Sequence, residues 1–262
     1  EPTSAFGWIS YLASRPRPAG GDAEAKARAA CRDHLVSVGF EAREVSFTYS
    51  PWPGRWGTPA AGIAWILAAL LAGLFPHAAL IVLIAAAVLI ALGARWLQRK
   101  GVLEGKAPGV NLEAKRGEPT IWLVAHIDSK SQPIPILVRA GSIVACIVIG
   151  VAMMAMAAFR VDGLAWQIVT LAAVLAGLPV AISTVGALSP GALDNATGVA
   201  TVLLVAERVD RSVPLGVLIT SAEELGLAGA RAWVRGQPAK GTVINCDTID
   251  DRGYLTIMHS HG

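Results

Sequence analysis

Three long stretches of this sequence contain no Asp, Glu, Lys or Arg, and they restrict the folds open to the chain more than any other feature. They hold 39, 20 and 31 residues and lie between Arg55 and Arg95, Arg139 and Arg160, and Asp162 and Asp194. A helix needs about 20 apolar residues to cross the hydrocarbon core of a bilayer. The stretches therefore predict four membrane-spanning helices, and buried helices of a large soluble core are the less favoured alternative.

The first stretch is long enough for two crossings, with Pro76 and His77 at the turn between them. We expect spans at roughly Pro59–Phe75, Ala78–Leu97, between Arg139 and Arg160, and Leu164–Ala187. Only 16% of the residues are charged and the mean hydropathy is +0.54, whereas soluble domains carry about 25% charged residues. The composition thus also indicates a lipid bilayer as a partner of the chain.

The two expected hairpins, residues 58–97 and 139–187, separate three segments that we expect to form one discontinuous domain. These segments are residues 1–57, 98–138 and 188–262, and each hairpin returns the chain to the side of the membrane that it left. Their residue patterns are typical of an α/β fold. Helices are expected at Gly21–Val38 and in "DNATGVATVLLVAERV" and "LGLAGARAWVRG", and strands in "FEAREVSFT", "GVNLEAKRG", "TIWLVAHID", "PLGVLITSAEE", "GTVINCDT" and "YLTIMHS".

Four acidic or histidine clusters each follow an apolar strand or precede a helix. They are His126 with Asp128, Asp194 with Asn195, Glu223 with Glu224, and Asp247. In open α/β sheets, ligands gather at the carboxyl ends of the strands. Carboxylates crowded at one edge repel each other unless a cation or shared protons offset their charge, and histidine with carboxylates suits zinc. The clusters therefore predict a metal site at one edge of the sheet.

Each cluster also has a purely structural interpretation. A histidine and an aspartate one residue apart are common beside turns, and Asp194 with Asn195 can cap the helix that follows. Acidic residues such as Glu223 and Glu224 are favoured at helix N-termini, and Asp247 fits a turn. Taken singly, these interpretations are preferred, but four clusters in this order are not explained by capping alone.

The segments "AHID", "GALDNATGVA", "SAEELGLAGARAW" and "INCDT" resemble, in this order, the motifs of the co-catalytic di-zinc aminopeptidases (metallopeptidase family 28). The resemblance covers the chain outside the expected spans, and its second and third motifs are the specific ones. It implies a mixed-sheet, three-layer zinc-peptidase domain of the phosphorylase/hydrolase-like kind, interrupted here by two inserted transmembrane hairpins. It also implies a peptide substrate and two zinc ions.

The resemblance further implies a role for each of these residues. Four of them would bind the two zinc ions: His126 and Asp247 the first, Glu224 the second, and Asp194 both. Glu223 would be the general base, and Asp128 would orient the His126 ring. Adjacent residues at a strand end point in opposite directions, so Glu223 and Glu224 can divide the work of base and ligand between them.

One departure from the family pattern concerns the second zinc ion, which normally takes a further histidine well downstream of Asp247. The sequence ends 15 residues after Asp247, and His259 and His261 are the histidines in that interval. They lie on a strand-like segment rather than on a later loop. We therefore expect either that one of them completes the second site, or that the sequence is a C-terminally incomplete piece that binds the second ion poorly.

The resulting hypothesis is a membrane-anchored, zinc-dependent exopeptidase, and an aminopeptidase in particular. Two alternatives stay open: a glutaminyl cyclase or carboxypeptidase with the same fold, and a membrane scaffold whose catalytic site has lapsed. Nucleic acid is not expected as a partner, because the net charge is only +3 and no basic run with interleaved aromatics occurs.

The charges near the helix ends predict the orientation of the chain in the membrane. Arg160 lies alone on one side, against six positive residues on the catalytic side: Arg55, Arg95, Arg99, Lys100, Lys130 and Arg139. The positive-inside rule then places the catalytic side in the cytoplasm.

Overall fold

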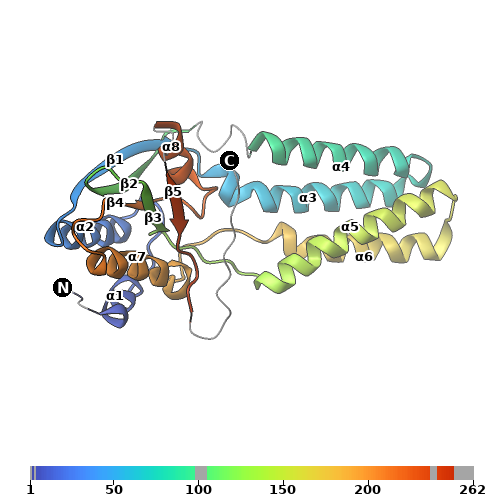
Figure 1. Cartoon of the computed structure of the whole chain (residues 1–262). Coiled ribbons are helices and arrows are strands. Elements are labelled where there is room, and N and C mark those ends of the chain that lie inside the picture. Colours follow the sequence, from blue (N-terminus) through green and yellow to red (C-terminus); the bar gives the residue numbers. More distant parts are fainter. Residues whose placement is uncertain (1, 3, 98–104, 237–240, 251–262) are drawn as a thin grey trace. The chain divides into compact units, whose positions relative to one another are not determined.

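The computed structural model describes residue 2 and residues 4–97, 105–236 and 241–250. The chain forms two compact units, each assembled from segments that are far apart in the sequence (Figure 1). The α/β unit comprises Glu1–Tyr49, Lys106–Lys130 and Ala187–Gly262, and the helical unit comprises Ser50–Gly105 and Ser131–Gly186.

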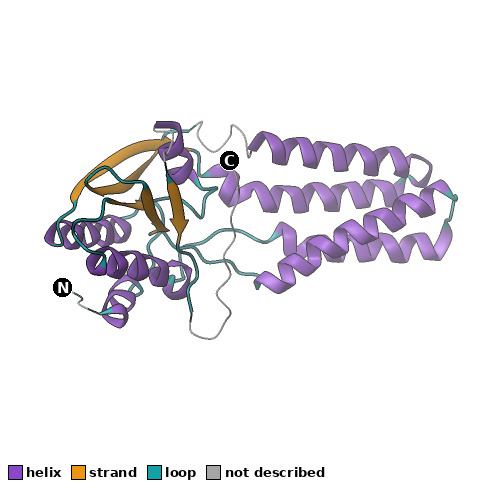
Figure 2. Ribbon diagram, viewed as in Figure 1, coloured by secondary structure: helices purple, strands orange, loops and turns teal. Residues whose placement is uncertain are grey.

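The α/β unit is built on a sheet of five strands (Figure 2). The strands are β1 (Glu41–Tyr49), β2 (Ala107–Arg116), β3 (Ile121–His126), β4 (Leu215–Thr220) and β5 (Thr242–Asn245). Their order in the sheet is β1-β2-β4-β3-β5. β1 pairs antiparallel with β2 and β2 with β4, whereas β3 runs parallel to both β4 and β5. The predicted α/β class with a mixed sheet is confirmed, and the predicted strand in "YLTIMHS" lies outside the described residues.

Side chains of the central strands alternate between the two faces of the sheet, because successive residues of a strand point in opposite directions. On β3, Leu123 and Ala125 enter the main hydrophobic core, whereas Trp122 and Val124 pack in a second cluster with Trp233. The core on the first face includes residues of α1 (Ala5–Leu12), α2 (Asp22–Ser37) and α7 (Thr197–Arg208), and the second face is covered by α8 (Ala228–Gly236).

Helix α1 was not anticipated by the sequence patterns. Its N-terminus is capped by Ser4, whose Oγ accepts a hydrogen bond from the backbone N–H of Gly7 at 3.1 Å. Trp8 and Leu12 are buried in the main core. Eight residues are too few for a clear helical periodicity, so this helix depends on the packing of its apolar face.

The described part of the helical unit contains four helices that are long and apolar enough to cross a membrane. They are α3 (Trp52–Leu74), α4 (Ala79–Trp96), α5 (Ile136–Ala158) and α6 (Gly163–Ala181), and the short 3-10 helix η1 (Pro76–Ala78) lies between α3 and α4. α3 and α5 begin before the predicted spans, and α6 ends at Ala181 rather than Ala187. The helical backbone can continue past the apolar run, so hydropathy alone does not mark where a helix ends.

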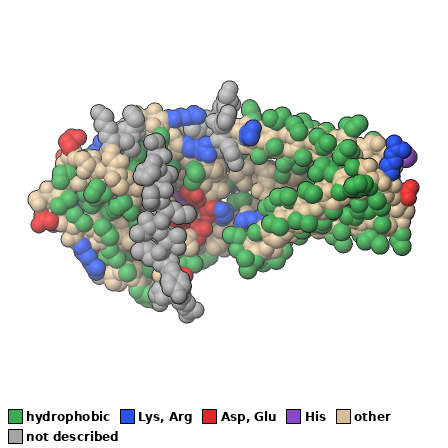
Figure 3. Space-filling model, turned by 45° about the vertical axis from the view of Figure 1, so that its right-hand side comes forward, with side chains coloured by type: hydrophobic (Ala, Val, Ile, Leu, Met, Phe, Trp, Pro, Cys, Tyr) green, Lys and Arg blue, Asp and Glu red, His purple; other side chains and the backbone are tan. Residues whose placement is uncertain are grey.

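Small residues lie where the four helices pack together. Ala69, Ala72 and Ala173 are completely buried, and a Cβ added to Gly62 would lie 2.3 Å from the backbone nitrogen of Ala181. Large apolar side chains instead cover the visible outer face of these helices (Figure 3). This distribution is the one expected for helices that pack closely within lipid.

The chain leaves the α/β unit and returns to it at neighbouring residues in both places. Tyr49, the last residue of β1, is paired in register with Ala107, the first residue of β2. At the second place, Ser129 Oγ donates a hydrogen bond to the carbonyl of Ser189 at 3.0 Å. The entropy of loop closure grows only slowly with length, so long segments can be inserted at both points without disturbing the sheet.

Candidate metal centre

Three strands end at the same edge of the sheet and bring polar residues to it. His126 is the last residue of β3 and pairs in register with Thr220, the last residue of β4. Glu223 and Glu224 follow β4, and Asp247 follows β5. Because β3 runs parallel to β4 and β5, the residues that follow the three strands gather at one edge.

A fourth segment reaches this edge from the start of α7. The π-helical turn η3 (Ala192–Ala196) leads into α7 and carries Asp194 and Asn195. Asn195 is buried; its Oδ1 accepts a hydrogen bond from the backbone N–H of Gly198 at 3.0 Å, and its Nδ2 donates to the carbonyl of Cys246 at 3.0 Å. The capping interpretation of this motif therefore describes Asn195, which also ties the start of α7 to the segment after β5.

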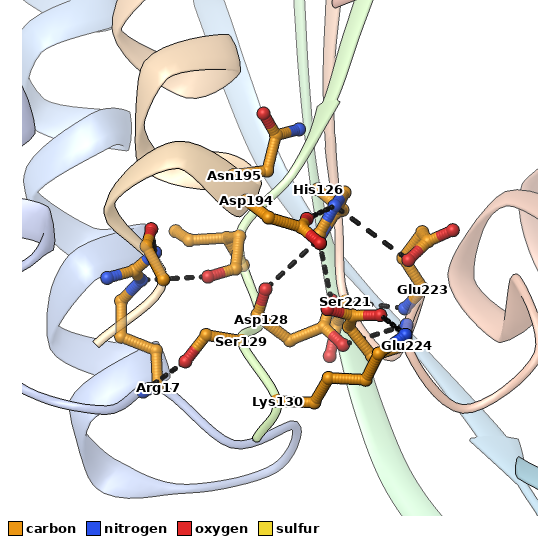
Figure 4. A network of polar contacts seen from close by, with 12 residues as sticks. Arg17, His126, Asp128, Ser129, Lys130, Asp194, Asn195, Ser221, Glu223 and Glu224 are labelled. Atoms are coloured by element: carbon orange, nitrogen blue, oxygen red, sulfur yellow. Dashed lines mark hydrogen bonds and ion pairs between the residues drawn. The ribbon is translucent and has the colours of Figure 1, made fainter. Parts of the chain in front are cut away.

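The imidazole ring of His126 is buried, and its Nε2 atom faces three carboxylates (Figure 4). Nε2 lies 3.0 Å from Asp194 Oδ1, 3.8 Å from Glu223 Oε2 and 3.8 Å from Asp247 Oδ1. Burial opposes protonation of the ring, but hydrogen bonds with Asp128, Asp194 and Asp247 outweigh it and raise the pKa of His126 to about 12. The carboxylates thus create a position at Nε2 that strongly favours a positive charge.

Asp128 connects the His126 ring to the turn that carries the two glutamates. Its backbone carbonyl oxygen lies 3.0 Å from His126 Nδ1, and its Oδ1 lies 3.6 Å from the same atom. The carboxylate also accepts hydrogen bonds from the backbone N–H groups of Glu223 at 3.0 Å and Glu224 at 3.1 Å. A bond at Nδ1 fixes the ring orientation, so one residue positions both the imidazole and the Glu223–Glu224 turn.

The surroundings shift the pKa values of two carboxyl groups in opposite directions. The hydrogen bond with His126 lowers the pKa of Asp247, against the opposing effect of its burial. Burial raises the pKa of Glu223, although the positive charge of His126 partly offsets this effect. A carboxylate with a lowered pKa suits a permanent ligand, whereas one with a raised pKa suits a group that accepts and releases a proton.

Arg17 holds together two segments of the site, and no sequence pattern had indicated this role. Its side chain is completely buried, and its Nε donates to the carbonyl of Ile127 at 2.9 Å, while Nη1 donates to the carbonyl of Pro190 at 2.8 Å. Its backbone N–H donates to Ser129 Oγ at 2.9 Å (Figure 4). One guanidinium therefore holds the segment after His126 against the segment before Asp194. The sequence signal was slight: an arginine between two prolines in "RPRPAG".

Lys130 and Glu224 form an ion pair beside the His126 cluster (Figure 4). Lys130 Nζ donates to Glu224 Oε2. The Glu224 side chain is only 4% exposed, and burial raises its pKa to about 7 even though Lys130 opposes this shift. The carboxylate expected to bind a second zinc ion is therefore paired with a lysine in this structure.

The residue types and distances in the centre fit a divalent metal ion. Ligand atoms of His126, Asp194 and Asp247 all lie within 4.8 Å of one another. Zinc bonds to histidine nitrogen and carboxylate oxygen at about 2.0–2.2 Å, so small side-chain rotations suffice to bring the three onto one ion. Within the described ranges, Glu224 is not in this group, and His259 and His261 lie outside those ranges.

Comparison with known families identifies the kind of protein to which this centre belongs. Residues 109–262, more than half of the chain, match the model of Peptidase family M28. The chain belongs to this family. Its α/β unit is thus an M28 metallo-hydrolase fold, and the matched residues include all six of the predicted site: His126, Asp128, Asp194, Glu223, Glu224 and Asp247.

Three solved structures resemble this M28 protein, each at 14% sequence identity. They are a glutaminyl cyclase from Fimbriiglobus ruber (TM-score 0.41, 90% of this chain and 55% of that chain), the zinc aminopeptidase BSAP from Bacillus subtilis (0.46, 93% and 68%) and an aminopeptidase from Aneurinibacillus sp. strain AM-1 (0.45, 96% and 72%). The chain thus spans about half the length of the glutaminyl cyclase. No curated protein matches the chain.

Proposed function

We propose that this M28 protein is a membrane-anchored, zinc-dependent exopeptidase that removes residues from the N-terminus of peptides. The observation that carries the proposal is the convergence of three carboxylates on Nε2 of His126. The four side chains come from four segments separated by up to about 120 residues of sequence. Capping and turn formation would not require them to meet at one atom.

Three residues would hold the metal ion: His126, Asp194 and Asp247. Bound there, a divalent ion lowers the pKa of a coordinated water to about 7 and polarises a carbonyl group. With three protein ligands, the ion would keep a further position open for water or substrate, as catalytic zinc sites do. The bond between His126 Nδ1 and the Asp128 carbonyl keeps Nε2 directed at the ion.

Glu223 is the residue that we assign to proton transfer. Its Oε2 lies 3.8 Å from His126 Nε2, which places the carboxylate beside the position of the ion. Burial raises the pKa of Glu223, so the protonated form is more accessible than for an exposed glutamate. Glu223 can therefore take a proton from the attacking water and pass it to the leaving amine.

The charges around the centre favour an amino group over a carboxylate as the terminal group of the substrate. Five carboxylates lie in the network and one lysine accompanies them: Asp128, Asp194, Glu223, Glu224 and Asp247, with Lys130. A negative field attracts the α-ammonium of a peptide and repels a C-terminal carboxylate. The negative charges outnumber the positive ones even when a divalent ion is counted, so the field favours an aminopeptidase over a carboxypeptidase. A glutaminyl cyclase stays the second candidate because its substrate also presents an N-terminal amine.

The test uses the full-length protein in detergent with a panel of aminoacyl amides, N-terminal glutaminyl peptides and C-terminally free peptides. We expect chelator-sensitive hydrolysis of aminoacyl amides. Glu223→Gln should lower kcat by about 10²–10⁴-fold while the metal content, measured by elemental analysis, stays unchanged. Glu118→Gln, in the exposed turn between β2 and β3, is the matched control and should leave both quantities unchanged.

Three outcomes would contradict the proposal. Unchanged turnover in Glu223→Gln would remove the assigned base. Release of ammonia from glutaminyl peptides without hydrolysis of amides would favour the cyclase. A metal-free protein that hydrolyses nothing would indicate a scaffold with a lapsed site.

We also propose that α3, α4, α5 and α6 cross a membrane and that the catalytic side faces the cytoplasm. Four long apolar helices support the first statement. The second depends on the positive-inside rule, and two of the charges counted there, Arg99 and Lys100, lie outside the described residues. Cys31 is fully buried and cannot report the orientation. An exposed position on α2, Ala25→Cys, should resist an impermeant thiol reagent in intact cells, whereas Val161→Cys, between α5 and α6, should react.

A further inference from the structure

The ion pair between Lys130 and Glu224 places a fixed positive charge where the family pattern predicts a second metal ion. Glu224 Oε2 accepts a hydrogen bond from Lys130 Nζ. The Glu224 side chain is nearly buried, whereas that of Lys130 is 30% exposed. The lysine therefore approaches from the solvent side and occupies one of the two oxygens of the carboxylate.

We infer that the ammonium group of Lys130 replaces the second metal ion, so that this centre binds one divalent ion instead of two. The inference rests on the proposed metal site at His126, Asp194 and Asp247, and it concerns Glu224, which the family resemblance assigns to a second zinc.

The number of ligands near Glu224 favours a single ion. In the part of the chain that the structure describes, one group of His, Cys, Asp and Glu side chains lies close enough together to hold an ion, and Glu224 is outside it. Glu224 Oε1 is buried and has no hydrogen-bond partner among the described residues. This atom would be one ligand for a second ion, and Asp194 would be another. Within the described residues, a second ion would therefore have fewer ligands than the first, and an ammonium group would compete with it more easily.

Electrostatic repulsion from Lys130 also disfavours a second ion. An ion bound to Glu224 and the ammonium of Lys130 would share one carboxylate and repel each other across a few ångströms. The ammonium already does part of what a second ion would do, because it places a positive charge against the nearly buried Glu224 carboxylate. With Lys130 paired to Glu224, little uncompensated negative charge remains there to attract a second divalent ion.

The backbone next to Lys130 is held in place by hydrogen bonds of Ser129. Ser129 is buried; its N–H donates to the carbonyl of Arg17 at 2.9 Å, and its Oγ donates to the carbonyl of Ser189 at 3.0 Å. Lys130 follows four residues after His126, on the same segment. The lysine is therefore part of the arrangement that holds the metal ligands and does not come from a free loop.

The experiment measures metal stoichiometry, which does not depend on turnover. The full-length protein in detergent is stripped with a chelator and titrated with zinc in a calorimeter, and elemental analysis counts the bound ions after desalting. Three variants accompany the wild type. Lys130→Met removes the charge, Lys130→Arg keeps it, and Lys26→Met removes an exposed lysine on α2 as the matched control.

We expect one zinc ion per chain for the wild type, Lys130→Arg and Lys26→Met, and a second binding event for Lys130→Met. Two ions in the wild type would overturn the inference and leave the proposed metallo-hydrolase intact. A single event in Lys130→Met would also overturn it, because Lys130 would not be what excludes the second ion. No bound ion in any variant would overturn both the inference and the proposed function. Circular dichroism checks that Lys130→Met is folded.

Discussion

The two units of this protein differ in where most of their large apolar side chains lie. In the α/β unit, large apolar residues such as Trp8, Leu35 and Ile127 are buried against the sheet. In the helical unit, Ala69 and Ala72 are completely buried together with Met153, but many other large apolar side chains are exposed, including Leu67, Leu89 and Leu175. Water drives large apolar groups into a core, whereas lipid does not, so helices in lipid pack through small residues. The exposed apolar side chains of the helical unit are therefore those expected of helices that pack within lipid.

The units also differ in how they treat polar groups. The α/β unit buries a set of charged or ionisable side chains, with Arg17, Glu24, Glu113, His126 and Asp128 nearly without exposure. All of them except Glu24 are tied by hydrogen bonds or ion pairs to segments distant in sequence. Trp233 Nε1, for example, donates to Glu113 Oε2 at 3.1 Å. In the helical unit, Trp65 Nε1 donates to the carbonyl of Ala173 at 2.9 Å, whereas the hydroxyl groups of Thr170 and Ser183 donate to carbonyls only four residues earlier. Polar networks thus specify the α/β unit, and close backbone approach specifies the helical one.

The largest effect is expected from removing the buried cation of the α/β unit. Arg17→Met leaves several carbonyl oxygens without a donor, including those of Ile127 and Pro190. Leaving a buried acceptor unsatisfied costs about 1–3 kcal/mol for each group. We expect the temperature at which the buried thiol of Cys31 becomes reactive to fall sharply, and zinc affinity to fall with it.

Arg17→Lys separates charge from geometry in this test. Lysine keeps the charge but lacks the planar fork that reaches several carbonyls at once, so we expect an intermediate loss. Normal Cys31 protection and normal zinc affinity in Arg17→Met would contradict the role assigned to the polar network.

Arg17 also marks the limit of what the sequence could predict. The strands, most helices and the residues of the four clusters are visible in local patterns, because periodicity and strand-end polarity are local properties. Arg17 and Ile127 meet only in the folded chain, and no local pattern announces that contact. The pairing of Lys130 with Glu224 could not be predicted for the same reason, since 94 residues separate them.

Asp128 shows a subtler limit. The resemblance implied that it orients the His126 ring, and its position two residues along made this plausible. Its bonds to the backbone N–H groups of Glu223 and Glu224 depend on the parallel register of β3 and β4. Register in a mixed sheet is set by tertiary packing, so these bonds required the structure.

The next effect concerns a buried carboxyl group of the α/β unit. Burial raises the pKa of Glu24 to about 7, compared with 4.5 in the unfolded chain. An acid whose pKa is raised by folding stabilises the folded state only while it is protonated, so stability falls as pH rises from about 4.5 to about 7. The shift corresponds to about 3 kcal/mol at higher pH.

Glu24→Gln should remove this dependence. The amide oxygen can still accept the hydrogen bond that Glu24 Oε2 takes from the backbone N–H of Gly20 at 2.7 Å, and Arg28 keeps its ion pair with Glu44 at 3.3 Å. We expect the variant to be more stable than the wild type at pH 8 and equal to it at pH 4.5, with the thermal unfolding transition followed by circular dichroism as the measurement, because thiols are almost unreactive at pH 4.5. A stability difference that does not change with pH would contradict the assignment.

The smallest effect is expected in the helical unit, where one methyl group tests the close approach of two helices. In Gly62→Ala, the new Cβ would lie 2.3 Å from the backbone nitrogen of Ala181 and 2.7 Å from its Cα. Backbone cannot move aside as a flexible side chain can, so α3 and α6 must separate, at a cost of about 1–3 kcal/mol. Gly93→Ala, on α4, is the matched control because a Cβ there meets nothing within 4 Å, and it should stabilise its helix by up to about 1 kcal/mol.

Both variants should keep the zinc stoichiometry and the Cys31 protection of the wild type, while the helical circular dichroism of Gly62→Ala is lost at a lower temperature. If Gly62→Ala instead weakened zinc binding as strongly as Arg17→Met, the stability of the metal centre would depend on the packing of the helical unit. The contrast between the two units would then be wrong.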